Sequence, residues 1–161
     1  MACLKMLKIT KEFSHEPKAR YGTGKVMREL SVKLNLPFDE RMQDWPYEVA
    51  QAADIEKYIE CYNAAKDDDE KFVLMEMLIQ AIEEQTDASF DKYWDIIQKM
   101  LEKDFWIHEY TIWYWCCFQS PTNNYAEDAL WKITPFVREL WNKHQSLAGQ
   151  TNPPLQSTTP P

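Results

Sequence analysis

Two adjacent thiols and an upstream histidine are the residues of this sequence with the types needed for nucleophilic catalysis. Cys116 and Cys117 are neighbours, and His108 precedes them by eight and nine residues. On one helix, with about 100° per residue, those offsets turn His108 about 80° and 180° away from the thiols, so it cannot be their base within that helix. The sequence also lacks a Gly-x-Ser-x-Gly turn, which would expose a serine nucleophile. We therefore predict that the chain is not an enzyme.

Metal and phosphate sites are also missing as motifs. A zinc site needs four ligands at workable spacing, whereas the three histidines are scattered along the chain. The segment YGTGK (21–25) contains Gly24 and Lys25 but continues with Val26, where a phosphate-binding loop has Ser or Thr. We therefore expect a simple turn before a helix there, and we expect no metal and no cofactor in the protein.

Carboxylates are the main candidates for a binding surface. Glu56 and Glu60 form an i, i+4 pair, and Asp91 and Asp95 form a second pair 35 residues later. Like charges at this spacing weaken a helix by about 0.2–0.5 kcal/mol, so aligning them has a small cost in stability. The predicted acidic surface consists of Glu56, Glu60, Glu83, Glu84, Asp87, Asp91 and Asp95. The alternative interpretation is a solvated outer face, in which lysines alternate with these carboxylates.

The net charge of −8 is unevenly distributed along the chain. Residues 1–43 carry nine Lys and Arg against five Asp and Glu, a net of +4, and residues 44–161 carry nine against 21, a net of −12. An acidic body disfavours nucleic acid, because phosphate contacts need a basic face, and it favours a basic protein partner. The chain lacks a run of about 18 apolar residues, so we expect no membrane span and a cytoplasmic location.

Half of the stretch FWIHEYTIWYWCCF (105–118) is aromatic. Drawn as a helix it is apolar almost all round, which is typical of a helix buried among neighbours, and we interpret it as the central core helix. His108 and Glu109 are its two strongly polar interruptions. A second hypothesis is a ligand pocket in this region. Its candidate lining residues are His108, Glu109 and Trp113, together with Trp106, Tyr110 and Tyr114.

The elements that must position these residues are helical. Only three glycines occur in the chain and none lies between residues 25 and 148, whereas an all-β protein needs frequent tight turns. Apolar residues instead recur at the three- and four-residue spacing of amphipathic helices, which predicts an all-α fold. The predicted helices span 25–34, 53–65, 67–85, 87–104, 105–118, 125–133 and 136–144.

A weak internal repeat accompanies these helices. The helices that begin near Asp54, Ser89 and Asn124 are spaced by 35 residues, and the same shift maps Tyr58 onto Tyr93. Apolar positions repeat even where the residue identities differ. This pattern favours stacked antiparallel helix pairs, each burying its apolar stripe against the next, and an irregular helical bundle is the alternative.

The composition divides the chain into three predicted parts. The basic N-terminal segment, residues 1–45, is expected to pack on the main domain, which is the helical domain of residues 46–144. Residues 145–161 hold four of the nine prolines and almost no large apolar side chain. We therefore expect a flexible tail there.

The segments DDDEKFVLMEMLIQAIEEQ (67–85), WIHEYTIWYWCCF (106–118) and LWKITPFVRELW (130–141) together resemble small bacterial HEAT-like helical-repeat proteins. Some proteins of that type act as immunity proteins for secreted toxins. The resemblance covers roughly residues 44–144, and the period here is shorter than the usual 40 or more residues of that repeat. It implies a binding role and supplies no functional residue.

The predicted function is a non-catalytic protein–protein interaction module, and its leading specific form is an immunity factor that binds a basic toxin through the acidic surface. The alternative is a helical small-ligand receptor or enzyme with an aromatic-lined pocket. A third interpretation is homo-oligomerisation through exposed aromatic side chains.

Overall fold

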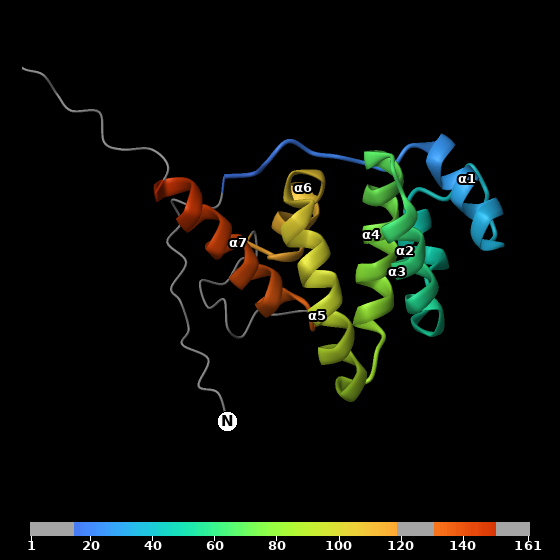
Figure 1. The fold of residues 1–161 in the computed structure, drawn as a ribbon. Coiled ribbons are helices and arrows are strands. Elements are labelled where there is room, and N and C mark those ends of the chain that lie inside the picture. Colours follow the sequence, from blue (N-terminus) through green and yellow to red (C-terminus); the bar gives the residue numbers. More distant parts are fainter. Residues whose placement is uncertain (1–14, 119–130, 151–161) are drawn as a thin grey trace, which may run out of the picture.

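The computed structural model describes residues 15–118 and 131–150 of the chain. Within these residues the fold is all-α, as the sequence predicts, with seven α-helices packed together and no strand (Figure 1). The helices are α1 (Gly24–Leu34), α2 (Trp45–Val49), α3 (Ile55–Ala64), α4 (Asp68–Glu83), α5 (Asp87–Lys103), α6 (Phe105–Trp115) and α7 (Thr134–Gln150), and a 3-10 turn at Ala52–Asp54 precedes α3.

The predicted helices 25–34, 53–65, 67–85, 87–104 and 105–118 are confirmed as α1, α3, α4, α5 and α6. The predicted helix 136–144 corresponds to α7, which begins at Thr134 and continues to Gln150, into the segment predicted as a tail. Most of the predicted helix 125–133 lies outside the described residues. The sequence did not predict α2, because five residues are too few to show a helical period.

Local capping explains where α4 begins. The side chain of Asp67 accepts hydrogen bonds from the backbone N–H groups of Asp69 and Glu70, at 2.9 and 3.1 Å. Three acidic residues also occupy the first turn, where negative charge favours the helix dipole. Asp54 occupies the N-cap position of α3, but its side chain makes no capping hydrogen bond.

The central helix of the fold is α4, which contacts α1, α2, α3, α5 and α6. Every residue from 72 to 79 on it is buried, because it has neighbours on all sides. Residues 105–118 therefore contribute to the core, as predicted, but the prediction that they form the central helix is wrong. α6 packs on α4, α5 and α7, and its remaining face leaves Trp106 72% and Tyr114 57% exposed.

The 35-residue register is visible in how the helices pack. It makes α3 equivalent to α5, and α4 equivalent to α6, and α4 indeed packs directly on α6. At the start of α3 and α5, the Glu56 carboxylate accepts hydrogen bonds from Lys92 Nζ at 3.1 Å and from the Tyr93 hydroxyl at 3.0 Å. Figure 1 shows α5 and α6 between α4 on one side and α7 on the other.

An extended segment, residues 15–23, runs across the ends of α6 and α4 before α1 begins (Figure 1). A glycine makes its close approach to α4 possible, since a Cβ on Gly22 would lie only 2.8 Å from Val73 Cγ2. Next to it, Arg20 forms an ion pair with Asp69 at 2.7 Å. These two contacts hold Arg20 and Tyr21 above the groove between α4 and α6.

Candidate functional site: an aromatic-walled cavity

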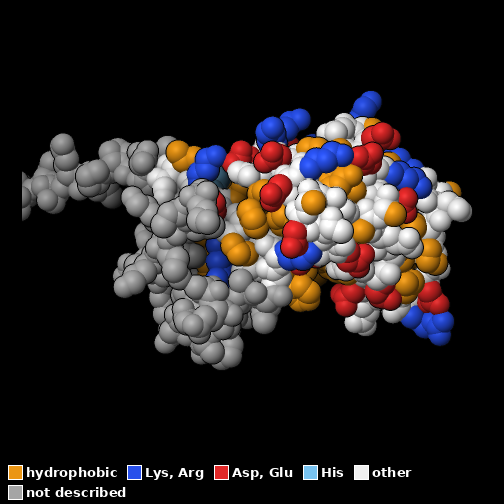
Figure 2. Space-filling view, turned by 90° about the horizontal axis from the view of Figure 1, so that it is seen from below, with side chains coloured by type: hydrophobic (Ala, Val, Ile, Leu, Met, Phe, Trp, Pro, Cys, Tyr) orange, Lys and Arg blue, Asp and Glu red, His pale blue; other side chains and the backbone are white. Residues whose placement is uncertain are grey.

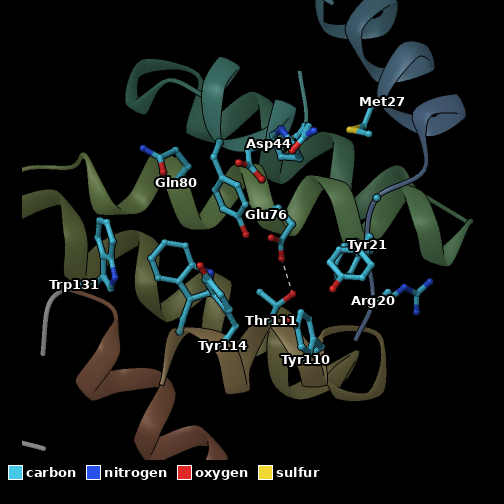
Figure 3. Close-up of a pocket in the computed structure, with 16 residues that line it drawn as sticks. Arg20, Tyr21, Met27, Asp44, Glu76, Gln80, Tyr110, Thr111, Tyr114 and Trp131 are labelled. Carbon is cyan, nitrogen blue, oxygen red and sulfur yellow. Dashed lines mark hydrogen bonds between the residues drawn. The ribbon is translucent and has the colours of Figure 1, made fainter. Parts of the chain in front are cut away.

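A cavity of about 430 Å³ opens between the N-terminal extended segment, α2, α4 and α6 (Figure 3). α4 contributes Phe72, Glu76 and Gln80, which are spaced by four residues and so share one helix face. α6 forms the opposite side of the cavity. The remaining lining comes from Met27 of α1, from the residues at the start of α2 and from Trp131, which lies three positions before α7. The cavity thus joins segments that are far apart in the sequence.

Aromatic rings from several segments form a connected set around this cavity. We call this set the aromatic wall, and its members are Tyr21, Tyr47, Tyr110, Tyr114, Trp115 and Trp131. Their ring centroids lie 6.1 Å apart for Tyr21–Tyr110, 6.4 Å for Tyr110–Tyr114, 5.9 Å for Tyr114–Trp115, 5.9 Å for Tyr47–Trp115 and 5.3 Å for Trp115–Trp131. Each ring therefore contacts the next.

Apolar surface is concentrated at this cavity. Among the described residues, six large hydrophobic side chains are exposed, and three of them, Tyr21, Tyr114 and Trp131, belong to the aromatic wall. Exposed apolar side chains scattered singly are ordinary, whereas a gathered patch marks a binding surface more often. The exposure here is therefore informative about function.

The polar group at the centre of the cavity is the carboxyl of Glu76, which is only 8% exposed. Its Oε1 accepts a hydrogen bond from the Thr111 hydroxyl at 2.5 Å, and its second oxygen accepts none from the described residues. Burial raises the pKa of Glu76 to about 7, against the opposing effect of the Thr111 hydrogen bond. Figure 3 shows this carboxyl directed from α4 toward Thr111, between Tyr21 and Tyr114.

Two further charged side chains line the cavity. Asp44, at the N-terminus of α2, is exposed and makes no capping hydrogen bond with its side chain. Arg20 is the cation of the lining, and it is engaged by Asp69 and lies over the Phe72 ring with 5.4 Å between its guanidinium carbon and the ring centroid. Because Arg20 is already paired, the cavity has an excess of negative charge.

The residues that the sequence singled out near residue 108 lie elsewhere. His108 and Trp113 are buried on other sides of α6 and do not line this cavity. Glu109 lines an adjoining depression beside Lys18 and Trp106, which shares Arg20, Tyr21 and Tyr110 with this cavity but does not place Glu109 in it. Of the aromatic residues named with the pocket hypothesis, Tyr110 and Tyr114 do line the cavity, whereas Trp106 and Trp113 do not.

His108 instead belongs to a buried polar chain. Its Nε2 lies 2.7 Å from the hydroxyl of Tyr62, which is also 2.9 Å from Asp104 Oδ2. Lys71 Nζ donates to the same Asp104 oxygen at 2.9 Å. Burial opposes ionisation of Asp104, but the hydrogen bonds from Lys71 and Tyr62 outweigh it and lower the pKa of this carboxyl.

The charge on Asp104 determines, through Tyr62, which ring nitrogen of His108 carries the proton. Because Tyr62 has one hydroxyl proton and donates it to the carboxylate, Nε2 of the imidazole carries a proton and donates to the Tyr62 oxygen. Burial lowers the pKa of His108 to about 3, so the ring is neutral at physiological pH. Tyr62 and His108 are buried at one end of this chain, and Asp104 and Lys71 are part-buried at the other.

Four members of the predicted acidic surface have partners within the chain. Glu56 pairs with Lys92, and Glu84 accepts from the side chain of Gln80 at 2.8 Å. Glu83 accepts from the backbone N–H groups of residues 132 and 133, at 3.0 and 2.6 Å, just before α7 begins. Asp87 lies 3.4 Å from Lys132.

The other three members, Glu60, Asp91 and Asp95, are exposed and form no ion pair with the described residues. On the face of the molecule seen in Figure 2, carboxylates are interspersed with Lys, Arg and apolar side chains, and they do not form a continuous area of one charge. The structure therefore leaves a smaller unpaired acidic group, on α3 and α5, than the sequence suggested.

The thiol of Cys116 has little nucleophilic character. Cys116 is buried, and burial raises the pKa of its thiol well above the ordinary value, which disfavours the thiolate. The backbone carbonyl of Cys116 accepts a hydrogen bond from Arg138 Nε at 2.7 Å. This hydrogen bond joins the C-terminal end of α6 to α7. Within the described part of the chain, Cys61, Cys116 and Cys117 are not in disulfides, and no group of three metal-ligating side chains is assembled.

Sequence reasoning missed Glu76 and Thr111. A signal was present, because Glu76 is the single charged residue within the apolar run FVLMEMLI, residues 72–79. A carboxylate at such a position is buried by its neighbours, and buried ionisable groups concentrate at functional sites.

None of the described helices is both long and apolar enough to cross a membrane. No protein-family model, curated protein or solved structure matches the chain. The resemblance to HEAT-like repeat proteins is therefore supported at the coarser level alone: the protein is a small all-helical one.

Proposed function

We propose that this protein binds a small organic ligand in the aromatic-walled cavity. The observation that carries the proposal is the combination of a gathered aromatic wall with one buried carboxyl, Glu76, at its centre. Ligand sites are typically concave, largely apolar and supplied with a few polar groups that orient the ligand. The cavity volume of about 430 Å³ falls within the usual range for such sites, roughly 300–1,000 Å³.

The charge of Glu76 supports a binding role over a purely structural one. Burying a carboxyl with a single hydrogen bond is unfavourable, and an apolar residue of similar size would stabilise the fold more. Two neighbouring lining residues, Gln80 and Thr111, are also polar. Retained polarity of this kind is expected where a ligand completes the hydrogen bonds.

The test is a screen of the full chain against a library of small aromatic and amine-containing molecules, with binding detected by ligand-observed NMR and by the fluorescence of Trp115 and Trp131. We expect hits whose signals are reduced by Tyr114→Ala, since this exposed ring forms part of the cavity. The matched control is Trp106→Ala, which removes an exposed aromatic ring on the same helix that does not line the cavity. Equal effects of the two substitutions would contradict the proposal.

A second candidate function is binding of a basic protein partner through the exposed carboxylates, as in an immunity factor of HEAT-like type. The observation that favours it is that Glu60, Asp91 and Asp95 are exposed without ion pairs to described residues, on two helices joined by the Glu56–Lys92 pair. Opposite charge across an interface speeds association.

Substitution of Glu60 and Asp95 by Lys tests this second function. We expect the double variant to lose capture of a basic partner at unchanged helicity, whereas Glu139→Lys, an exposed carboxylate on α7, serves as the control. Unchanged capture by the double variant would remove this candidate.

A further inference from the structure

We infer that the ligand of the cavity is an organic cation with an alkylated ammonium group, held between the Glu76 carboxylate and the aromatic wall. This inference rests on the proposed ligand-binding function and specifies its chemical class. Charge, ring type and ring geometry around the cavity carry it.

The charges that face the cavity select against an anion. Glu76 and Asp44 are both carboxylates of the lining, and the single cationic side chain among the lining residues, Arg20, is paired with Asp69 at 2.7 Å. An anionic ligand would meet two like charges and no free positive group. A cation would instead supply the partner that the second oxygen of Glu76 lacks among the described residues.

The composition of the aromatic wall suits an alkylated ammonium group. All six of its members are Tyr or Trp, the side chains whose ring faces attract cations, and the single phenylalanine of the lining, Phe72, already lies under the Arg20 guanidinium. A cation over such faces keeps its electrostatic stabilisation while its methyl groups are removed from water.

The angles between the rings add a reason to expect several contacts at once. The rings of Tyr114 and Trp115 meet at 81°, and those of Trp115 and Trp131 at 75°. Rings that meet near a right angle form corners, so that a rounded trimethylammonium group can contact two faces together. A flat neutral aromatic ligand would stack on one face and gain less from such a corner.

The experiment compares choline with dimethylbutanol, its neutral isostere in which a carbon atom replaces the charged nitrogen. Both are titrated into the full chain, near pH 8, and followed by protein NMR. We expect choline to bind about tenfold more tightly than its isostere, because the two differ only in charge. Glu76→Gln should weaken choline binding about tenfold and leave the isostere unaffected.

Two controls accompany this titration. Glu109→Gln neutralises a part-buried carboxylate on α6 outside the cavity and should leave choline binding unchanged. Asp44→Asn removes the second carboxylate of the lining from an exposed position, so it tests the charge argument independently should Glu76→Gln disturb the fold. It should weaken choline binding, and by less than Glu76→Gln does, since Asp44 is open to solvent.

The outcomes separate the inference from the function on which it rests. Equal binding of choline and its isostere, or tighter binding of the isostere, would overturn the cationic class and leave the ligand-binding function standing. Choline binding that neither Glu76→Gln nor Asp44→Asn weakens would also overturn it. If neither choline nor its isostere binds while neutral library molecules do, the cationic class alone is overturned. If neither probe binds and no library molecule binds, the ligand-binding function is overturned as well.

Discussion

Glu76 and Thr111 are 35 residues apart in the sequence and joined by a 2.5 Å hydrogen bond between α4 and α6. They occupy equivalent positions in the 35-residue register, in the second helix of successive helix pairs. Stacking of the pairs thus brings one register position into contact with its own counterpart. In this protein the contact forms the polar centre of the cavity, so the packing of equivalent helices also builds the candidate site.

The first prediction concerns Glu76 and stability. Its pKa is raised from 4.5 to about 7 by burial, so below about pH 4.5 the carboxyl is protonated in both folded and unfolded states. As pH rises, the unfolded chain ionises first and the free energy of unfolding falls, until the loss is complete above about pH 7. The shift corresponds to a loss of about 3 kcal/mol, as an upper value.

Glu76→Gln should remove this pH dependence while keeping a similar shape and an acceptor for Thr111. We expect the variant to be more stable than the wild type near pH 8 and similar to it near pH 4.5, as measured by denaturant unfolding at each pH. Equal stabilities at both pH values would show that Glu76 is better solvated than its burial indicates.

The second prediction concerns His108, whose pKa burial lowers from 6.5 to about 3. Above about pH 6.5 the ring is neutral in both states, so its contribution to stability is complete there. As pH falls toward 3, the unfolded chain binds a proton that the folded chain excludes, and the free energy of unfolding decreases by up to about 5 kcal/mol.

The ring nitrogens of His108 report this directly. We expect their NMR shifts to remain those of a neutral ring protonated on Nε2 down to about pH 4, as the hydrogen bond to Tyr62 requires. The substitution His108→Gln, which retains a donor toward Tyr62, should reduce the sensitivity of stability to acid. A ring that titrates near pH 6 would mean that the chain through Asp104 is open to water.

The third prediction uses two glycines that lie two positions apart. A methyl group on Gly22 would lie 2.8 Å from Val73 Cγ2, whereas nothing lies within 4 Å of the corresponding position on Gly24. Gly22→Ala should therefore displace the extended segment, destabilise the fold by about 1–3 kcal/mol and weaken ligand binding through Tyr21. Gly24→Ala, in the first turn of α1, is the control and should not destabilise the protein. Similar unfolding midpoints for both variants would contradict the close packing of this segment on α4.

The helices were largely predictable because their signals are local. Apolar spacing marked α3, α4 and α5, and Asp67 marked the start of α4. The relative burial of α4 and α6 was not predictable in this way, since it depends on how many neighbours each helix acquires. The very apolar α6 was expected at the centre, yet Trp106 and Tyr114 face outward, because the described residues place helices against three of its sides and not against the fourth.

The candidate site was predictable only in part, for a similar reason. Tyr110 and Tyr114 were identified because they belong to a conspicuous aromatic helix. Tyr21 and Tyr47 come from segments without a helical period, and no local pattern places them beside α6. Glu76 could have been found by combining its charge within an apolar run with the 35-residue register, which sets it opposite Thr111.

The last prediction joins the pKa of Glu76 to the proposed cationic ligand. A cation favours the ionised carboxylate, so the affinity for choline should rise with pH as Glu76 loses its proton, by up to about tenfold in all, and level off above about pH 7. The other titratable groups that line the cavity are Arg20, Tyr21, Asp44, Tyr47, Tyr110 and Tyr114. Burial raises the pKa of Tyr110, which keeps its hydroxyl protonated over this range.

Choline carries a permanent charge, so any change in affinity with pH comes from the protein. NMR titrations of the wild type and of Glu76→Gln between about pH 5.5 and 8 measure the effect, and we expect the variant to show weak and nearly constant affinity. A wild-type affinity that does not change with pH would mean that Glu76 is not the group that meets the cation.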